Sequence, residues 1–225
     1  MATAVVAAGG SGERLGAGMP KALAPLLGRP MITWSLAALE ASERILNAVI
    51  AAPPGHEDEV EAIAREVLGM PFTVATGGET RSQSVANAIG ALEGSYELVI
   101  HDAARPLAEA ALFDRCVERL DHWRCDGVVA AARAVDTIKE ADAGGRVIAT
   151  LERGTLWAVQ TPQVFQPGPL LKALDAGDLT RATDDAQLVE AVGGDIRVVE
   201  APRHNLKVTN EQDLRIAEMM LAQRG

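Results

Sequence analysis

The chain opens on an apolar run, Thr3-Ala4-Val5-Val6-Ala7-Ala8, that leads into a glycine-rich loop, Gly9-Gly10-Ser11-Gly12-Glu13-Arg14. The apolar run is typical of a buried parallel strand, and the loop leaves its carboxyl end. Closely spaced glycines let backbone N–H groups approach a phosphate that a Cβ would push away. Arg14 and, after Met19-Pro20, Lys21 add a planar guanidinium and a mobile ammonium beside this loop. The stretch therefore predicts an α/β fold with a triphosphate site beyond its first strand.

The loop differs from the two best-known phosphate-binding patterns. It has no Gly-x-x-x-x-Gly-Lys-Ser/Thr, so it is not a Walker loop. The acidic residue that follows a dinucleotide fingerprint by about 20 residues is missing, because that stretch holds Gly28-Arg29-Pro30. A plain turn between strand and helix would also use such glycines. The remaining pattern, Gly-x-Gly-x-Arg followed by Pro-Lys, resembles the nucleotidyltransferases that load sugars or polyols onto nucleotides.

Composition limits the class of protein and its partners. With 225 residues, 48% of them hydrophobic, the chain is long enough for one domain, or for a domain with an appendage. Together with the resemblance of the loop, this length leads us to expect a single nucleotidyltransferase domain over residues 1–225. A net charge of −10 makes nucleic acid and anionic membranes poor partners. The apolar start is too short for a signal peptide, and no run approaches the ~20 residues of a membrane span, so we expect a cytoplasmic protein.

Strand-like and helix-like segments alternate along the chain. We expect further strands at 48–52, 72–75, 98–100, 127–131 and 196–199, and helices at 30–42, 57–68, 82–92, 107–120 and 210–223. This alternation predicts a Rossmann-like fold of three layers, with helices on both faces of a mostly parallel sheet. Cys116 and Cys125 have no ligand cluster around them, so we expect reduced, half-buried thiols.

Residues 133–156 break this alternation. Val135, Thr137 and Lys139 alternate before Gly144-Gly145, and alternation resumes at Val147, which is a hairpin pattern with a glycine turn. A two-stranded arm is marginally stable on its own. We therefore expect a projecting β-hairpin arm that pairs with a second copy of the chain in a homodimer.

Two segments follow strands at the expected carboxyl edge of the sheet. Backbone groups near Gly77 and the Ser84 hydroxyl could bind a flat base, although this stretch could equally be a turn with Ser82 as a helix cap. Asp102 follows the strand at 98–100 and suits Mg²⁺ carried by phosphates, with a structural pair to Arg105 as the alternative.

Two further residues stand out. His101 is expected to pack or hydrogen-bond rather than to act as a base. Lys207 lies in an apolar, strand-like run, where a lysine needs an anionic partner.

Seven segments together resemble the 2-C-methyl-D-erythritol 4-phosphate cytidylyltransferases, in the order and spacing of that family. They are the glycine loop with Arg14 and Pro20-Lys21, Gly77-Gly78 to Ser84-Val85, His101-Asp102-Ala103-Ala104-Arg105-Pro106, Asp136-Thr137-Ile138-Lys139, Thr161-Pro162-Gln163, Thr183-Asp184-Asp185 and Asn205-Leu206-Lys207-Val208-Thr209.

The resemblance implies an activity: the 4-phosphate of the polyol attacks the α-phosphorus of CTP, in the presence of Mg²⁺, and pyrophosphate leaves. Ribitol 5-phosphate is the alternative acceptor, and a CTP-sensing module without catalysis is the remote alternative.

The resemblance also implies roles for individual residues. Catalysis falls to Arg14, Lys21, Arg153 and Lys207. Nucleotide binding falls to Ala8, Gly9, Gly10, Gly12, Gly77, Ser84, Asp102 and Ala103. Binding of the polyol phosphate falls to Asp102, Arg105, Thr137, Lys139, Thr161 and Thr183, and metal binding to Asp102. Thr137, Lys139 and Arg153 lie on the expected arm, so each arm would reach into the neighbour's active site.

Overall fold

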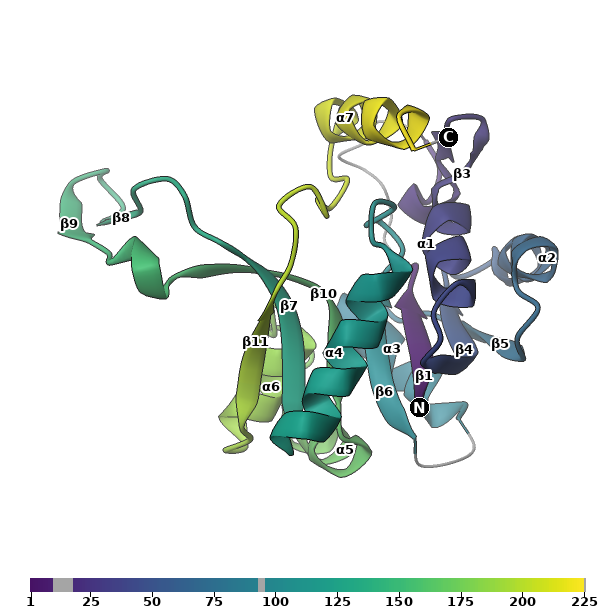
Figure 1. Cartoon of the computed structure of the whole chain (residues 1–225), viewed down its shortest axis with the longest axis horizontal. Helices are drawn as coiled ribbons and strands as arrows, with labels where there is room; N and C mark the ends of the chain where they lie inside the picture. The colour runs from purple at the N-terminus through teal and green to yellow at the C-terminus, as the bar shows by residue number, and fades with distance from the viewer. Residues whose placement is uncertain (10–17, 93–95, 225) are drawn as a thin grey trace.

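The computed structural model describes residues 1–9, 18–92 and 96–224, and these form a central sheet of seven strands (Figure 1). In spatial order the strands are β11 (Ile196–Glu200), β7 (Gly127–Arg133), β10 (Trp157–Phe165), β6 (Glu97–Asp102), β1 (Ala2–Ala7), β4 (Ile45–Ala52) and β5 (Phe72–Thr76). β10 runs antiparallel to both neighbours, and the other pairs are parallel. The carboxyl ends of the parallel strands therefore meet at one edge, where ligands bind in such sheets.

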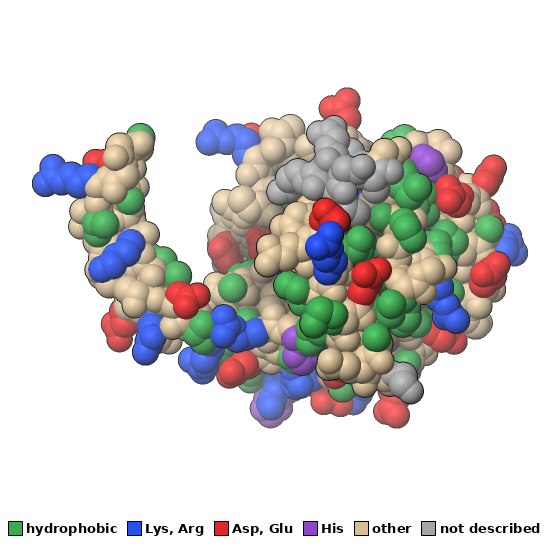
Figure 2. All heavy atoms as spheres, turned by 90° about the horizontal axis from the view of Figure 1, so that it is seen from above, with side chains coloured by type: hydrophobic (Ala, Val, Ile, Leu, Met, Phe, Trp, Pro, Cys, Tyr) green, Lys and Arg blue, Asp and Glu red, His purple; other side chains and the backbone are tan. Residues whose placement is uncertain are grey.

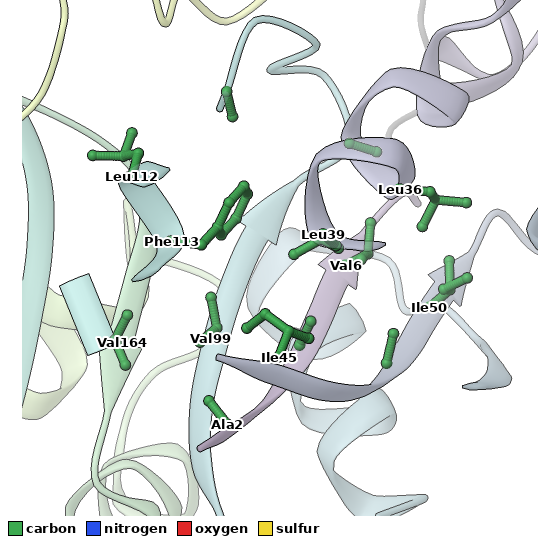
Figure 3. Packing of buried hydrophobic residues seen from close by; sticks show 14 of the residues in the cluster. Ala2, Val6, Leu36, Leu39, Ile45, Ile50, Val99, Leu112, Phe113 and Val164 are labelled. Carbon is green, nitrogen blue, oxygen red and sulfur yellow. The ribbon is translucent and has the colours of Figure 1, made fainter. Parts of the chain in front are cut away.

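Helices cover both faces of this sheet. One face carries α1 (Met31–Glu40), α2 (Glu57–Val67) and α4 (Ala110–Trp123), and the other carries α3 (Arg81–Gly90), α5 (Pro167–Ala176) and α6 (Asp185–Ala191). Side chains of β1 alternate between the two cores, with Val6 in the first and Val5 in the second. Figure 3 shows Leu36 and Leu39 of α1 beside β1, and Phe113 of α4 near β6. The three expected layers are confirmed.

A third, smaller core supports the carboxyl edge of the sheet. The last helix, α7 (Glu211–Ala222), packs there against a short hairpin made of β2 (Pro25–Leu26) and β3 (Arg29–Pro30), with Leu26, Val208 and Leu221 buried between them. A capping box at Asn210 and Asp213 starts α7. The segment that carries Lys207 is therefore held between this core and the end of β6.

The arm predicted at 133–156 is confirmed. β8 (Lys139–Ala141) and β9 (Val147–Thr150) form a hairpin that projects from the sheet, and Gly145 adopts a left-handed φ of 81° in its turn (Figure 1). Among residues 133–155 only Ala134 and Ala149 are even partly buried. Figure 2 shows the arm standing off from the body, with apolar and basic side chains along it. Ile148 is 62% exposed, so the arm has apolar surface that no part of its own chain covers.

The largest error of the sequence analysis lies between the arm and residue 196, where it assigned no element. The structure has β10, α5 and α6 there. The middle of β10 is the polar stretch Gln160-Thr161-Pro162-Gln163, which reads as a loop because proline cannot donate to a ladder. The register with β7 shifts between Val159 and Gln163, so the sheet accommodates this stretch as an irregularity.

Smaller corrections concern single residues. Thr80, not Ser82, caps α3, because its hydroxyl accepts from the Gln83 N–H. Cys116 and Cys125 are free, and both are buried rather than half-buried. Lys207 lies in an irregular segment and not in a strand. Within the described ranges no helix is both long and apolar enough to cross a bilayer.

Candidate active site

A cavity of about 340 Å³ lies beyond the carboxyl ends of β1 and β6. Close packing explains two of the glycines beside it. A Cβ on Gly9 would lie 2.9 Å from the Ser84 Oγ, and a Cβ on Gly77 would lie 2.8 Å from the carbonyl oxygen of Ala52. The cavity is lined by Ala7, Ala8, Gly9, Lys21, Ala22, Glu79, Thr80, Arg81, Ser84, Asp102, Ala103, Ala104 and Lys207.

The Ser84 hydroxyl fixes the shape of this cavity. Its Oγ accepts a hydrogen bond from the Gly78 N–H at 2.9 Å and donates to the Thr80 carbonyl at 2.9 Å. The hydroxyl proton is thus engaged within the chain, and toward a ligand Ser84 can only accept. Together with the capping box of Thr80 and Gln83, this bond ties the loop after β5 to the start of α3.

A second cavity, of about 240 Å³, adjoins the first. Its lining comes from β10, from the residues just before α6, from the end of β6 and the turn after it, and from the first residue of α3 and the segment before α7. It consists of Arg81, Asp102, Arg105, Val159, Gln160, Thr161, Gln163, Thr183, Asp184 and Lys207. Arg81, Asp102 and Lys207 line both cavities. Two ligands bound side by side would therefore meet at these three charged side chains.

Asp102 is the centre of a charge network at this meeting point. Its Oδ1 accepts from the Arg81 Nε at 2.7 Å, and its Oδ2 lies 2.7 Å from the Lys207 Nζ. The Arg81 Nη1 also donates to the Asp185 Oδ2 at 2.6 Å. The structural pair with Arg105 exists but is the longest contact, at 3.9 Å. Lys207 has the anionic partner that the sequence analysis required.

The network sets the ionisation of its members. Burial alone would raise the pKa of Asp102, but Arg81, Lys207 and Arg105 outweigh burial and hold that pKa well below its ordinary value. Burial opposes ionisation of Arg81, yet Asp102 and Asp185 raise the pKa of this guanidinium. For Asp185 the contacts with Arg81 do not offset burial, to which Asp102 and Asp184 add, and its pKa is raised. Arg81 and Asp102 are therefore a charged pair throughout the physiological range.

His101 is a structural neighbour of the network. It is fully buried, its Nδ1 lies 3.0 Å from the Thr161 Oγ1, and its ring meets Phe113 edge to face. Burial lowers the pKa of His101 to about 3, so the imidazole is neutral at physiological pH. The Thr161 Oγ1 also accepts from the Asp102 N–H at 3.1 Å, which links β10 to β6. The expectation that His101 packs and hydrogen-bonds is confirmed.

Most of the predicted site residues come together. Ala8, Gly9, Lys21, Ser84, Asp102, Ala103 and Lys207 line the first cavity, and Arg105, Thr161 and Thr183 line the second. Gly77 packs behind Gly9. Thr137, Lys139 and Arg153 are exposed on the arm and line neither cavity of their own chain. Gly10, Gly12 and Arg14 lie outside the described residues.

Sequence reasoning missed Arg81 and the residues that accompany it. Arg81 is the first residue of α3, and Gln160, Gln163 and Asp184 line the second cavity. One signal was present in the sequence: a basic residue at the start of a helix opposes the helix dipole and therefore needs another reason to be there. Asp185 gave no such signal, because an acidic residue in the first turn of a helix suits the helix dipole, yet in the structure it is completely buried.

The surroundings of Asp102 test its predicted role as a Mg²⁺ ligand. A divalent cation coordinates carboxylate oxygens that are free to face it. Here one oxygen faces Arg81 and the other faces Lys207, so a direct ligand bond would place a third cation at the same carboxylate. Residues 1–9, 18–92 and 96–224 contain no group of three His, Cys, Asp or Glu side chains that could hold a metal. This arrangement does not fit Asp102 as a direct ligand, and the use of Mg²⁺ stays a prediction.

The fold and the site are those of a nucleotidyltransferase of the α/β class, with one cavity at the carboxyl edge of a mostly parallel sheet, where Gly9 is part of the lining, and a second cavity adjoining it. The family model described as 2-C-methyl-D-erythritol 4-phosphate cytidylyltransferase matches residues 2–223. The chain belongs to this family.

Individual relatives agree over nearly the whole chain. The 2-C-methyl-D-erythritol 4-phosphate cytidylyltransferase of Synechococcus elongatus is 42% identical, over 98% of this chain and 96% of its own length. That of Synechocystis is 41% identical, over 98% and 97%. Among solved structures, 4-diphosphocytidyl-2C-methyl-D-erythritol synthase from Anaerococcus prevotii has a TM-score of 0.85 at 25% identity, covering 99% of this chain and 98% of its own. The predicted family and enzyme class are confirmed.

Proposed function

We propose that this chain transfers a cytidylyl group from CTP to 2-C-methyl-D-erythritol 4-phosphate and releases pyrophosphate. The observation that carries the proposal is the pair of adjoining cavities that share Arg81, Asp102 and Lys207. The first cavity, with Gly9 and Lys21 in its lining, suits the nucleotide. The second cavity, with hydroxyl, amide and guanidinium groups, suits a polyol phosphate. Family membership over residues 2–223 supports the choice of both substrates.

The transfer needs alignment and charge stabilisation more than acid–base chemistry. An oxygen of the acceptor phosphate forms a bond to the α-phosphorus as the bond from that phosphorus to the bridging oxygen of pyrophosphate breaks. The attacking phosphate is already an anion, so no base is required, which agrees with a neutral, buried His101. In this proposal Lys21, with Arg14, stabilises the charge on the phosphorus, and Lys207 orients the attacking phosphate.

The arm supplies the remaining residues of the proposed site. Thr137, Lys139 and Arg153 lie on a projecting hairpin, and apolar side chains of that hairpin are exposed. Their exposure favours a homodimer in which each arm covers the partner's second cavity, where Arg153 would join Lys207 at the acceptor phosphate. We further propose that the enzyme works in the cytoplasm, which suits its two free, buried thiols.

Mg²⁺ is part of the proposal as an ion that arrives with the triphosphate. Such an ion needs few protein ligands, so Asp102 can remain engaged with its cations. Activity should then rise when the concentrations of Mg²⁺ and CTP are raised together. It should be lost when EDTA is added. Activity that is unchanged in EDTA would contradict the use of a divalent ion.

The experiment that tests the function measures pyrophosphate release with CTP, Mg²⁺ and each candidate acceptor. We expect turnover with 2-C-methyl-D-erythritol 4-phosphate and formation of the CDP-linked product. Faster turnover with ribitol 5-phosphate would replace the acceptor. Tight CTP binding without pyrophosphate release from any acceptor would instead indicate a nucleotide-sensing module.

A further inference from the structure

Arg81 has no role in the transfer as described so far, although it lines both cavities. Its side chain is 23% exposed, and two of its nitrogens are bound to carboxylates that are 7% and 0% exposed. These two bonds connect segments that are far apart in sequence: the start of α3, the end of β6 and the start of α6. The bonds make Arg81 the link between the nucleotide side and the acceptor side of the site.

Helix stability does not explain this arginine. Arg81 follows the cap residue Thr80 directly, so it lies in the first turn of α3, where the helix dipole disfavours a cation. The guanidinium is a rigid fork that can hold two carboxylates at once, which a lysine ammonium does with less geometric control. The bridge between Asp102 and Asp185 is therefore the reason for an arginine at this position.

The bridge divides the charge of Asp102 between two cations. One oxygen of this carboxylate is held by Arg81 and the other faces Lys207, each at 2.7 Å. If Arg81 were absent, the whole charge of Asp102 would act on Lys207 and, at longer range, on Arg105. A lysine held in that way would leave its carboxylate less readily for a substrate phosphate.

We propose that Arg81 is a positioning residue for the transfer: by taking part of the charge of Asp102, it leaves the Lys207 ammonium available to a phosphate in the second cavity. Arg81 acts through Asp102 and need not touch either substrate. Asp185 fixes the other side of the guanidinium, since its buried carboxylate holds Arg81 in the orientation that reaches Asp102. This inference rests on the proposed function for its kinetic test only.

The first test is kinetic and uses Arg81→Met. We expect kcat/KM for the polyol phosphate to fall about tenfold or more, as for loss of charge preorganisation in a site. Because the variant leaves Asp185 buried and unpaired, Arg81→Met/Asp185→Asn is measured beside it to secure the fold. The matched control is Arg44→Met. Arg44 lies just before β4 and forms an ion pair with Glu118, and its replacement should leave kcat/KM unchanged.

The second test observes Lys207 directly. The chain has only four lysines, so ¹⁵N-lysine labelling gives few side-chain signals, and Lys207→Met identifies the one that belongs to Lys207. Inorganic phosphate serves as the probe, so this test does not depend on the identity of the acceptor. We expect phosphate to shift the Lys207 signal in the wild-type protein and to shift it much less in both Arg81 variants.

The outcomes separate the two claims. If the wild-type protein releases no pyrophosphate with any acceptor, the proposed function fails, while the phosphate titration still tests Arg81. If wild type is active and the folded double variant retains its kcat/KM, the positioning role is wrong. A Lys207 signal that responds to phosphate equally with and without Arg81 would also overturn the inference, even if activity falls.

Discussion

Replacing Asp102 by asparagine tests the charge network as a whole, because it removes the central charge and nearly preserves the shape. Arg81 would keep Asp185 as a partner, whereas Lys207 and Arg105 would lose theirs. Removing one partner of a buried ion pair costs about 3–5 kcal/mol. Lys207 is 38% exposed and water screens part of its charge, so we expect the free energy of unfolding at pH 7 to fall by about 2 kcal/mol.

The pH dependence of this loss has a definite sign. The neighbouring cations hold the pKa of Asp102 below its unfolded value, so its stabilisation is present above the unfolded pKa and is lost as the pH falls toward the folded one. With an unfolded pKa of about 3.9, the difference between wild type and Asp102→Asn should be about 1 kcal/mol smaller at pH 3 than at pH 7. Asp185 titrates in both proteins and largely cancels in the difference.

Urea unfolding at a fixed protomer concentration, at pH 7 and at pH 3, measures both quantities. Asp195→Asn is the control, because Asp195 pairs with Arg197 on the surface and its removal should leave the free energy of unfolding nearly unchanged. The reasoning is refuted if Asp102→Asn is as stable as wild type at pH 7, or if its deficit is the same at both pH values.

Three further predictions concern the site and the arm. Lys21→Ala should lower kcat by roughly 100-fold or more, whereas Lys172→Ala, on the exposed side of α5, should leave kcat unchanged. Steady-state pyrophosphate release measures both variants. If kcat of Lys21→Ala equals that of the wild-type protein, Lys21 takes no part in catalysis. Mixing Lys21→Ala protein with Arg153→Ala protein should restore one of the two sites in each mixed dimer; no recovery after confirmed subunit exchange would mean that Arg153 serves its own chain. Gly77→Ala should raise KM for CTP, since the new Cβ would lie 2.8 Å from a backbone carbonyl oxygen and displace the loop that is proposed to bind the base. An unchanged KM would mean that the base binds elsewhere.

The sequence was most informative where local pattern and position agree. The run at 3–8 and the residues at 98–100 were expected to be buried strands whose carboxyl ends lie at one edge of the sheet, and β1 and β6 do pair in parallel. Lys207 was identified as a residue that needs an anion because an isolated lysine in an apolar run is costly to bury. Each of these inferences uses only the periodicity and chemistry of one short segment.

The remaining features depend on contacts between distant segments. Arg81 and Asp185 are separated by 104 positions, and neither local sequence shows that they meet. β10 was missed because it contains a proline and two glutamines, whereas a strand between two others such as β6 and β7 is normally apolar. Here the polar side chains of β10 line a cavity. Tertiary structure, not propensity, decides both cases.

The place of β10 in the sheet also orders the events by which a growing chain folds. β6, β1, β4 and β5 are neighbours that are all present once residue 102 has been made, so that half of the sheet can form early. β7 has to wait, because both of its neighbours, β10 and β11, come later in the chain. During synthesis α4 can already pack on one face of β7, but β7 has no strand to pair with until β10, which ends at Phe165, has emerged. In this interval, in which the whole arm is also being made, the unpaired edges of β7 favour aggregation of the nascent chain.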